Sequence, residues 1–167
     1  MSAAISVTLS IIALGFSLYV FIDARKRDRR DIFLKLHDLL LSDDAMRGRQ
    51  LLYEKITDEN SVEQITHDEY RDIHRAIGML NALAYHMKRG YVNEADVMGM
   101  WGEALYRACL AARPVLAHRE HRTGYRPWIH LEYLERRTHA YVTRIGGGSV
   151  PGFTVWKRSG TGNASAG

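Results

Sequence analysis

The longest uninterrupted run of apolar positions stands near the start of the chain. Residues 3–22 contain no charged residue and no proline, and their sequence is AAISVTLSIIALGFSLYVFI. An α-helix rises about 1.5 Å per residue, so a helix of this length spans roughly 30 Å, the thickness of a bilayer's hydrocarbon core. We therefore expect residues 1–22 to form a single transmembrane anchor.

Two other interpretations of this run fit the pattern less well. A cleaved signal peptide needs a basic start and small residues at its cleavage site, whereas this chain begins with Met1-Ser2 and the run ends in Phe21-Ile22-Asp23. A helix buried in a soluble core is usually shorter and keeps a polar face.

Small residues recur along the run at steps of three and four, which places them on one face of a helix. Such residues let two helices approach closely in lipid, and serine hydroxyls can bond across the contact. The pattern allows a helix–helix contact in the membrane, and so a homo-oligomer, but small residues are also common in such spans by chance. The contact residues would be Ser6, Ser10, Ala13 and Ser17.

A basic segment, residues 23–30, follows the run directly, and no basic residue precedes it. This asymmetry predicts that the N-terminus lies outside and that the remainder lies in the cytoplasm, as in a single-pass inner-membrane protein. The same side chains can contact anionic lipid headgroups. They are Arg25, Lys26, Arg27, Arg29 and Arg30.

After residue 30, apolar positions recur at the three- and four-residue spacing of amphipathic helices. The first helix should continue without a break to Leu41, and residues 57–65 should form a polar turn. We expect an all-α fold in which the membrane helix continues into a small helical bundle over residues 31–145, followed by a flexible tail over residues 146–167. The remaining helices should cover residues 45–56, 66–89, 94–113, 114–122 and 128–145.

Capping and breaking residues set these boundaries. Thr66 and Glu69 have the spacing of a capping box, and Asn93 can cap the helix that follows. Pro114 should end or kink a helix, because proline lacks the backbone N–H and clashes with the preceding turn.

Charge is distributed unevenly around a net value of +4. Residues 31–100 carry eight basic and thirteen acidic side chains, whereas residues 101–167 carry ten basic and four acidic ones. The basic ends favour an anionic partner, with membrane lipid first. Nucleic acid is the weaker alternative, because the late arginines lack the clustered aromatic residues of a stacking platform.

No catalytic, cofactor or metal motif stands out. The only cysteine, Cys109, lies in an apolar helical pattern and is expected to be a buried small hydrophobe, with no disulfide within the chain. His118 and His121 do not have the spacing of a zinc motif, and Arg119 and Arg122 beside them would repel a cation. No glycine-rich phosphate loop follows a strand.

One aromatic and basic set remains as a candidate interaction groove: Trp101, Arg119, Tyr125 and Trp128. Aromatic and arginine side chains act as interface anchors. They also form the cores of small bundles, with ring bodies buried and polar tips hydrated. The sequence leaves both interpretations open.

The chain resembles a bacterial family of short membrane-anchored helical proteins that is classed as a domain of unknown function. The resemblance lies in residues 79–84 (MLNALA) and 88–96 (KRGYVNEAD), with Trp101, Leu105 and Arg113-Pro114 after them. It includes the N-terminal span with its basic segment and covers the chain to about Arg137. The resemblance implies an all-α fold and a membrane tether, and it implies no particular activity.

These observations predict a protein-interaction or sensing module at the inner membrane, with membrane lipid and an unidentified protein as partners. One alternative is a membrane-tethered hydrolase or nuclease whose carboxylates and histidines assemble from distant helices. The other is an effector that oligomerises in the membrane.

Overall fold

The computed structural model describes residues 2–146, with side chains from residue 12 onward, as six α-helices. They are α1 (Ser2–Leu41), α2 (Asp43–Lys55), α3 (Glu59–Gln64), α4 (His67–Lys88), α5 (Glu94–Thr123) and α6 (Leu131–Ile145). No strand occurs within residues 2–146, so the expected all-α class is confirmed. The tail expected after Gly146 lies outside the described residues.

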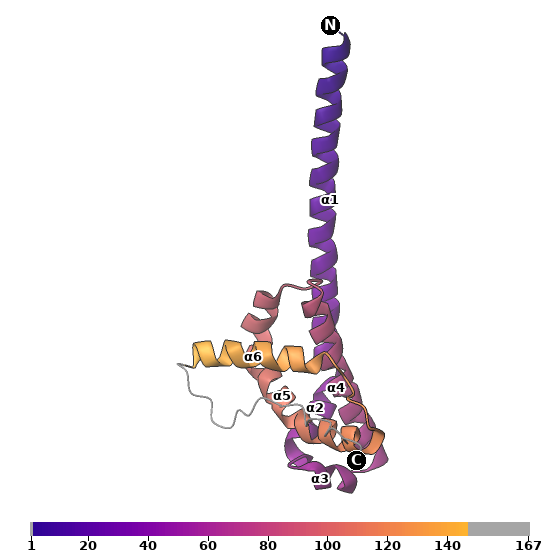
Figure 1. Cartoon of the computed structure of the whole chain (residues 1–167), viewed down its shortest axis with the longest axis vertical. Helices are drawn as coiled ribbons and strands as arrows, with labels where there is room; N and C mark the ends of the chain where they lie inside the picture. The colour runs from indigo at the N-terminus through magenta and orange to yellow at the C-terminus, as the bar shows by residue number, and fades with distance from the viewer. Residues whose placement is uncertain (1, 147–167) are drawn as a thin grey trace, which may run out of the picture.

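Helix α1 is continuous to Leu41, as the apolar spacing predicted, and its N-terminal part stands clear of the bundle as a rod (Figure 1). The large apolar side chains between Ile12 and Ile22 are 45–72% exposed. Contact with the bundle comes later, where Leu36 and Leu40 are buried and Ile32 and Phe33 pack against the core. The helix therefore has a packed end and an unpacked apolar end.

The described residues do not support the expected transmembrane helix. Across the residues that the structure describes, no helix is both long enough and apolar enough to cross a bilayer. Residues 3–11 of the apolar run lie outside the described side chains.

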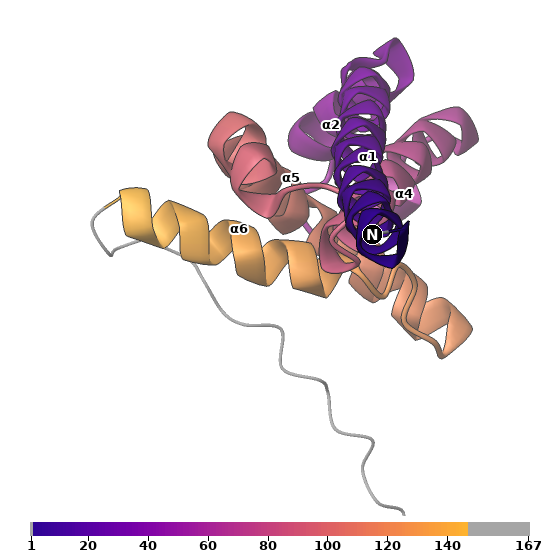
Figure 2. The same ribbon diagram turned by 90° about the horizontal axis from the view of Figure 1, so that it is seen from above.

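The other helices form the bundle at the base of the rod, where α2 packs mainly on α4 and α6 mainly on α5. Seen from above, α2, α4 and α5 gather around α1 and α6 runs off to one side (Figure 2). The largest fully buried side chains are Leu52, Ile73, Ile77, Leu80, Leu83, Leu134, Val97, Val115 and Thr138. Burial of an aliphatic side chain of this size stabilises the folded state by about 1.5–3 kcal/mol, so these residues form the stabilising core of the bundle.

The predicted start signals are confirmed. Thr66 accepts from the Glu69 amide at 3.3 Å, while the Glu69 carboxylate accepts from the Thr66 amide at 3.0 Å, which completes the capping box of α4. Asn93 accepts from the Ala95 amide at 3.0 Å and caps α5.

Three boundaries differ from the sequence prediction. The segment expected to be a turn contains α3, because Asp58 and Ser61 form a second capping box. Helix α5 runs through Pro114 without ending, since Ala112, Val115 and Leu116 on both sides of it remain buried in the core. Tertiary packing thus outweighs the hydrogen bond that proline removes.

The last helix begins at Leu131 rather than at residue 128. Trp128 has a φ of +49°, in the left-handed region that an α-helix excludes. The turn after it is closed by a bond from the Leu131 amide to the Trp128 carbonyl at 3.0 Å, and Asn81 accepts from the His130 amide at 3.0 Å.

Candidate functional site

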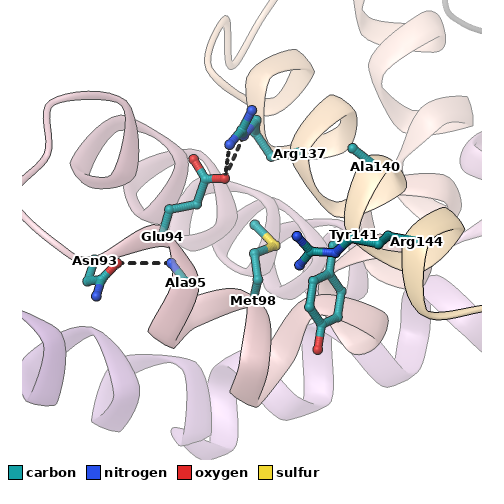
Figure 3. A pocket seen from close by; sticks show the side chains of 8 residues that line it. All are labelled: Asn93, Glu94, Ala95, Met98, Arg137, Ala140, Tyr141 and Arg144. Atoms are coloured by element: carbon teal, nitrogen blue, oxygen red, sulfur yellow. Dashed lines mark hydrogen bonds and ion pairs between the residues drawn. The ribbon is translucent and has the colours of Figure 1, made fainter.

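Two cavities that share the lining residue Asn93 flank the start of α5. The larger, of about 660 Å³, lies between the start of α5 and the outer half of α6, and the smaller, of about 290 Å³, lies between α1 and the start of α5. We call this pair the junction site. The larger cavity is lined by Asn93, Glu94, Ala95, Met98, Arg137, Ala140, Tyr141 and Arg144 (Figure 3). The smaller is lined by Lys26, Arg29, Arg30, Phe33, Asn93 and Asp96.

Asn93 belongs to both cavities. Its Oδ1 atom accepts from the Ala95 amide, which fixes the side chain at the first turn of α5. Among the described residues its Nδ2 group has no partner, so this amide remains a donor at the boundary between the cavities.

The acidic wall of the larger cavity is neutralised within the protein. Glu94 accepts from Nε of Arg137 at 2.6 Å and from the Tyr133 hydroxyl at 2.9 Å. The bond to Glu94 raises the pKa of Arg137, and burial together with the same carboxylate raises the pKa of Tyr133. Glu94 therefore contributes little free negative charge to the cavity.

Arg144 forms the opposite wall. Its guanidinium lies 5.7 Å from the ring centroid of Tyr141 and, as Figure 3 shows, turns toward Met98 at the side of the cavity. The ring of Tyr141 is held close to α5 because Gly102 has no side chain: a Cβ atom there would lie 2.5 Å from Cδ1 of Tyr141. Close packing thus positions the residue on which Arg144 stacks.

The basic segment of α1 divides into two groups. Lys26, Arg29 and Arg30 line the smaller cavity, are exposed, and make no ion pair within the described part of the chain. By contrast, Arg27 pairs with Asp23 at 2.6 Å, and Arg25 stacks on Phe21 at 5.4 Å. The five residues predicted to contact headgroups therefore differ in how many of their donors are free.

The four residues of the expected groove do not form one site. Arg119 stacks on Trp128 at 4.9 Å and donates from Nη1 to Nδ1 of His74 at 3.0 Å. Trp101 lies elsewhere, 5.4 Å from the His37 ring of α1, and Tyr125 is an exposed loop residue. The structure thus joins Arg119 to Trp128 and separates both from Trp101.

The other predicted residues divide in a similar way. Ser6 and Ser10 of the small-residue face lie outside the described side chains, whereas Ala13 and Ser17 are exposed on the rod. His118 is buried, and His121 is exposed and bonded to Glu59 at 2.8 Å. Over the residues that the structure describes, no group of three or more histidine, cysteine or acidic side chains could hold a metal ion.

A buried polar cluster lies deeper, between α5 and α6. Arg113 donates from Nε to Glu135 at 3.0 Å, and Tyr106 and Cys109 lie nearby. Burial raises the pKa of the Cys109 thiol well above its ordinary value. Because the thiolate is the reactive form, this cysteine is suited to packing rather than to nucleophilic chemistry.

Sequence reasoning missed the α6 side of the junction site. Arg137, Tyr141 and Arg144 are spaced i, i+4 and i+7 and so share one helix face. This pattern was visible in the sequence, but it did not reveal that the face lies beside Asn93.

The comparisons with known proteins give a family and no activity. No curated protein and no solved structure matches the chain. The model of a domain of unknown function, DUF4760, matches residues 1–138, from the start of the chain to within α6. The chain therefore belongs to the DUF4760 family.

Proposed function

We propose that this protein is a membrane-tethered binding module, in which residues 3–22 lie in the inner membrane and the helical bundle is held at its cytoplasmic surface. The observation that carries the proposal is the bare rod of α1, whose described apolar side chains are exposed on every side. Large exposed apolar surfaces mark contact with a membrane or another protein.

Two further features support a membrane over a soluble partner. The apolar run of residues 3–22 has the length of a membrane span. Basic side chains begin at Arg25, within one helical turn of Ile22, on the side where the bundle lies. A soluble partner would not require basic residues on one side of the run only.

The bundle offers a surface for a protein partner around Arg119, Trp128 and exposed Tyr125. Arginine and aromatic side chains are typical interface anchors. In this role α1 sets the location, and the bundle recruits or senses a partner there. The small-residue face of the rod would allow self-association of the anchors.

The test is extraction of membranes by alkaline carbonate after expression of the full chain. Wild type should remain in the pellet, whereas Leu14→Arg combined with Leu18→Arg should move the chain to the supernatant, because each arginine near a span's centre opposes insertion by about 2.5–3.5 kcal/mol. The matched control, Leu34→Arg with Leu39→Arg, places the same charges at exposed leucines of the same helix outside the apolar run.

Release of wild type into the supernatant would overturn the proposal. So would a soluble oligomer of the purified chain that forms without detergent and buries Leu14 and Leu18 between copies.

A further inference from the structure

We infer that the junction site binds a phosphate ester, the group carried by the headgroup of an anionic glycerophospholipid and by soluble phosphomonoesters. The inference deepens the proposed function and, for the lipid source, rests on it. It assigns a specific site to part of the basic segment, and it adds residues of α5 and α6.

The first argument is that several basic side chains at the cavities make no ion pair in the described part of the chain. Lys26, Arg29 and Arg30 make no ion pair in the described part of the chain, and Arg144 is engaged only with the Tyr141 ring. Much of the remaining bundle behaves differently, since Arg47, Lys55, Arg75, Arg107 and Arg126 each pair with a carboxylate. Three cations without an ion pair in the described part of the chain therefore line the smaller cavity, and the fourth, Arg144, lines the larger one.

The second argument is the charge balance. The carboxylates that face the cavities are Glu94 and Asp96, and Glu94 is already bonded to Arg137 and Tyr133. Asp96 is the acidic group left to oppose the four free cations among the described lining residues. Guanidinium groups bind phosphate oxygens through paired N–H donors, and the Nδ2 group of Asn93 adds a neutral donor between the cavities.

The third argument is size and lining. The larger cavity falls in the range of about 300–1,000 Å³ that is typical of small-ligand sites. Phe33, Met98 and Tyr141 provide apolar surface beside the charges. A phosphate ester fits such a combination, with its phosphate at Arg29 and Arg30 of the smaller cavity and its carbon atoms against Phe33.

The fourth argument is position along α1. Lys26 and Arg30 follow Ile22 by four and eight residues, which corresponds to roughly 6 and 12 Å along a helix. Headgroups extend about 5–8 Å beyond each side of the hydrocarbon core. With residues 3–22 in the bilayer, the end of the smaller cavity at Lys26 would lie at the depth of the headgroups, and Arg30 would lie about 4 Å beyond them.

The test compares two triple variants of the full chain, purified in detergent with a mixture of phosphatidylglycerol and phosphatidylcholine. Arg29→Gln, Arg30→Gln and Arg144→Gln alter the junction site. Lys35→Gln, Arg122→Gln and Arg136→Gln remove the same charge at exposed positions outside the cavities and outside the basic segment of residues 23–30. Bound lipid is counted by native mass spectrometry, and circular dichroism checks that both variants fold.

Wild type should retain phosphatidylglycerol over phosphatidylcholine. In the site variant the preference for phosphatidylglycerol should be at least tenfold weaker than in wild type, since each basic charge near the headgroups contributes about fivefold to the binding of anionic lipid. The control variant should stay within about twofold of wild type. An equal loss in both variants, or no preference in wild type, would overturn the inference.

Glycerol 1-phosphate at millimolar concentration separates the two sources. The ligand is a soluble phosphate ester if glycerol 1-phosphate displaces the lipid and is itself retained only when Arg29, Arg30 and Arg144 are present. The ligand is the headgroup if the lipid stays bound. Retention of glycerol 1-phosphate by a chain that carbonate releases from membranes would support the site while contradicting the tether.

Discussion

Gly102 shows how one missing side chain fixes the wall of the junction site. Helix α5 has another glycine one turn earlier, Gly99, where a Cβ atom would meet nothing within 4 Å. At Gly102 it would meet the ring of Tyr141 at 2.5 Å. The two glycines are on the same helix, but only Gly102 is required by close packing.

We predict that Gly102→Ala lowers the free energy of unfolding by about 1–3 kcal/mol, because the added methyl group forces the Tyr141 ring away. Gly99→Ala should leave stability unchanged or raise it by up to about 1 kcal/mol through helix propensity. Urea unfolding of both variants, followed by circular dichroism, measures the difference. Equal stability of the two variants would contradict the packing argument.

His74 gives a second prediction. Burial and the neighbouring Arg119 guanidinium lower the pKa of His74 from 6.5 to about 4. Between these pH values the unfolded chain binds a proton at His74 that the folded chain does not, so the folded state should lose stability as the pH falls from about 6.5 to about 4. His74→Gln should therefore show a smaller loss than wild type between pH 7 and pH 5.

The difference should be on the order of 1 kcal/mol, since His74 is partly exposed and solvent reduces the effect. The control is His67→Gln, which changes an exposed histidine of the same helix and should keep the pH dependence of wild type. A wild-type pH dependence in His74→Gln would contradict the assignment.

Single residues were predictable from the sequence where their partners are local. Thr66 and Glu69 are three residues apart, so their capping box could be recognised directly. The stack of Arg119 on Trp128 depends on the left-handed turn at Trp128, and the place of Arg144 depends on which face of α6 meets α5. No local pattern encodes either of these.

At the scale of elements, capping groups and burial together determine where helices begin and end. Pro114 is a strong breaker in isolation, yet α5 continues because its buried side is continuous. The 57–65 segment looked like a turn, yet Asp58 and Ser61 make it helical. Local signals therefore predict a helix boundary only where capping and burial agree.

Thr66→Ala tests the contribution of one cap. Its loss leaves the Glu69 amide without its acceptor, so the free energy of unfolding should fall by about 1 kcal/mol. Thr66→Ser should retain most of the stability, because its hydroxyl can accept the same bond. Thr57→Ala, at an exposed threonine of the loop before α3, serves as the control, and a loss equal to that of Thr66→Ala would contradict the capping role.

At the scale of the whole molecule, the protein combines an apolar rod with a bundle that carries free cations at the base of that rod. The proposed membrane contact explains why leucines and phenylalanines of α1 are exposed. The proposed phosphate site explains why basic residues at the cavities have no partner in the described part of the chain. The sequence predicted the rod and the all-α bundle. It could not predict the junction site, because the residues that line it come from three segments, 26–33, 93–98 and 137–144, that are far apart in the chain.

The most direct measurement is the depth of nitroxide labels along α1 in the full chain reconstituted into vesicles. Labels replace Leu14, Leu18, Leu34 or Leu39 one at a time through an introduced cysteine, and Cys109 should not react because it is buried. Labels at 14 and 18 should be accessible to oxygen and protected from a water-soluble nickel chelate, while labels at 34 and 39 should show the reverse. Equal access of the nickel chelate to all four positions would contradict the tether.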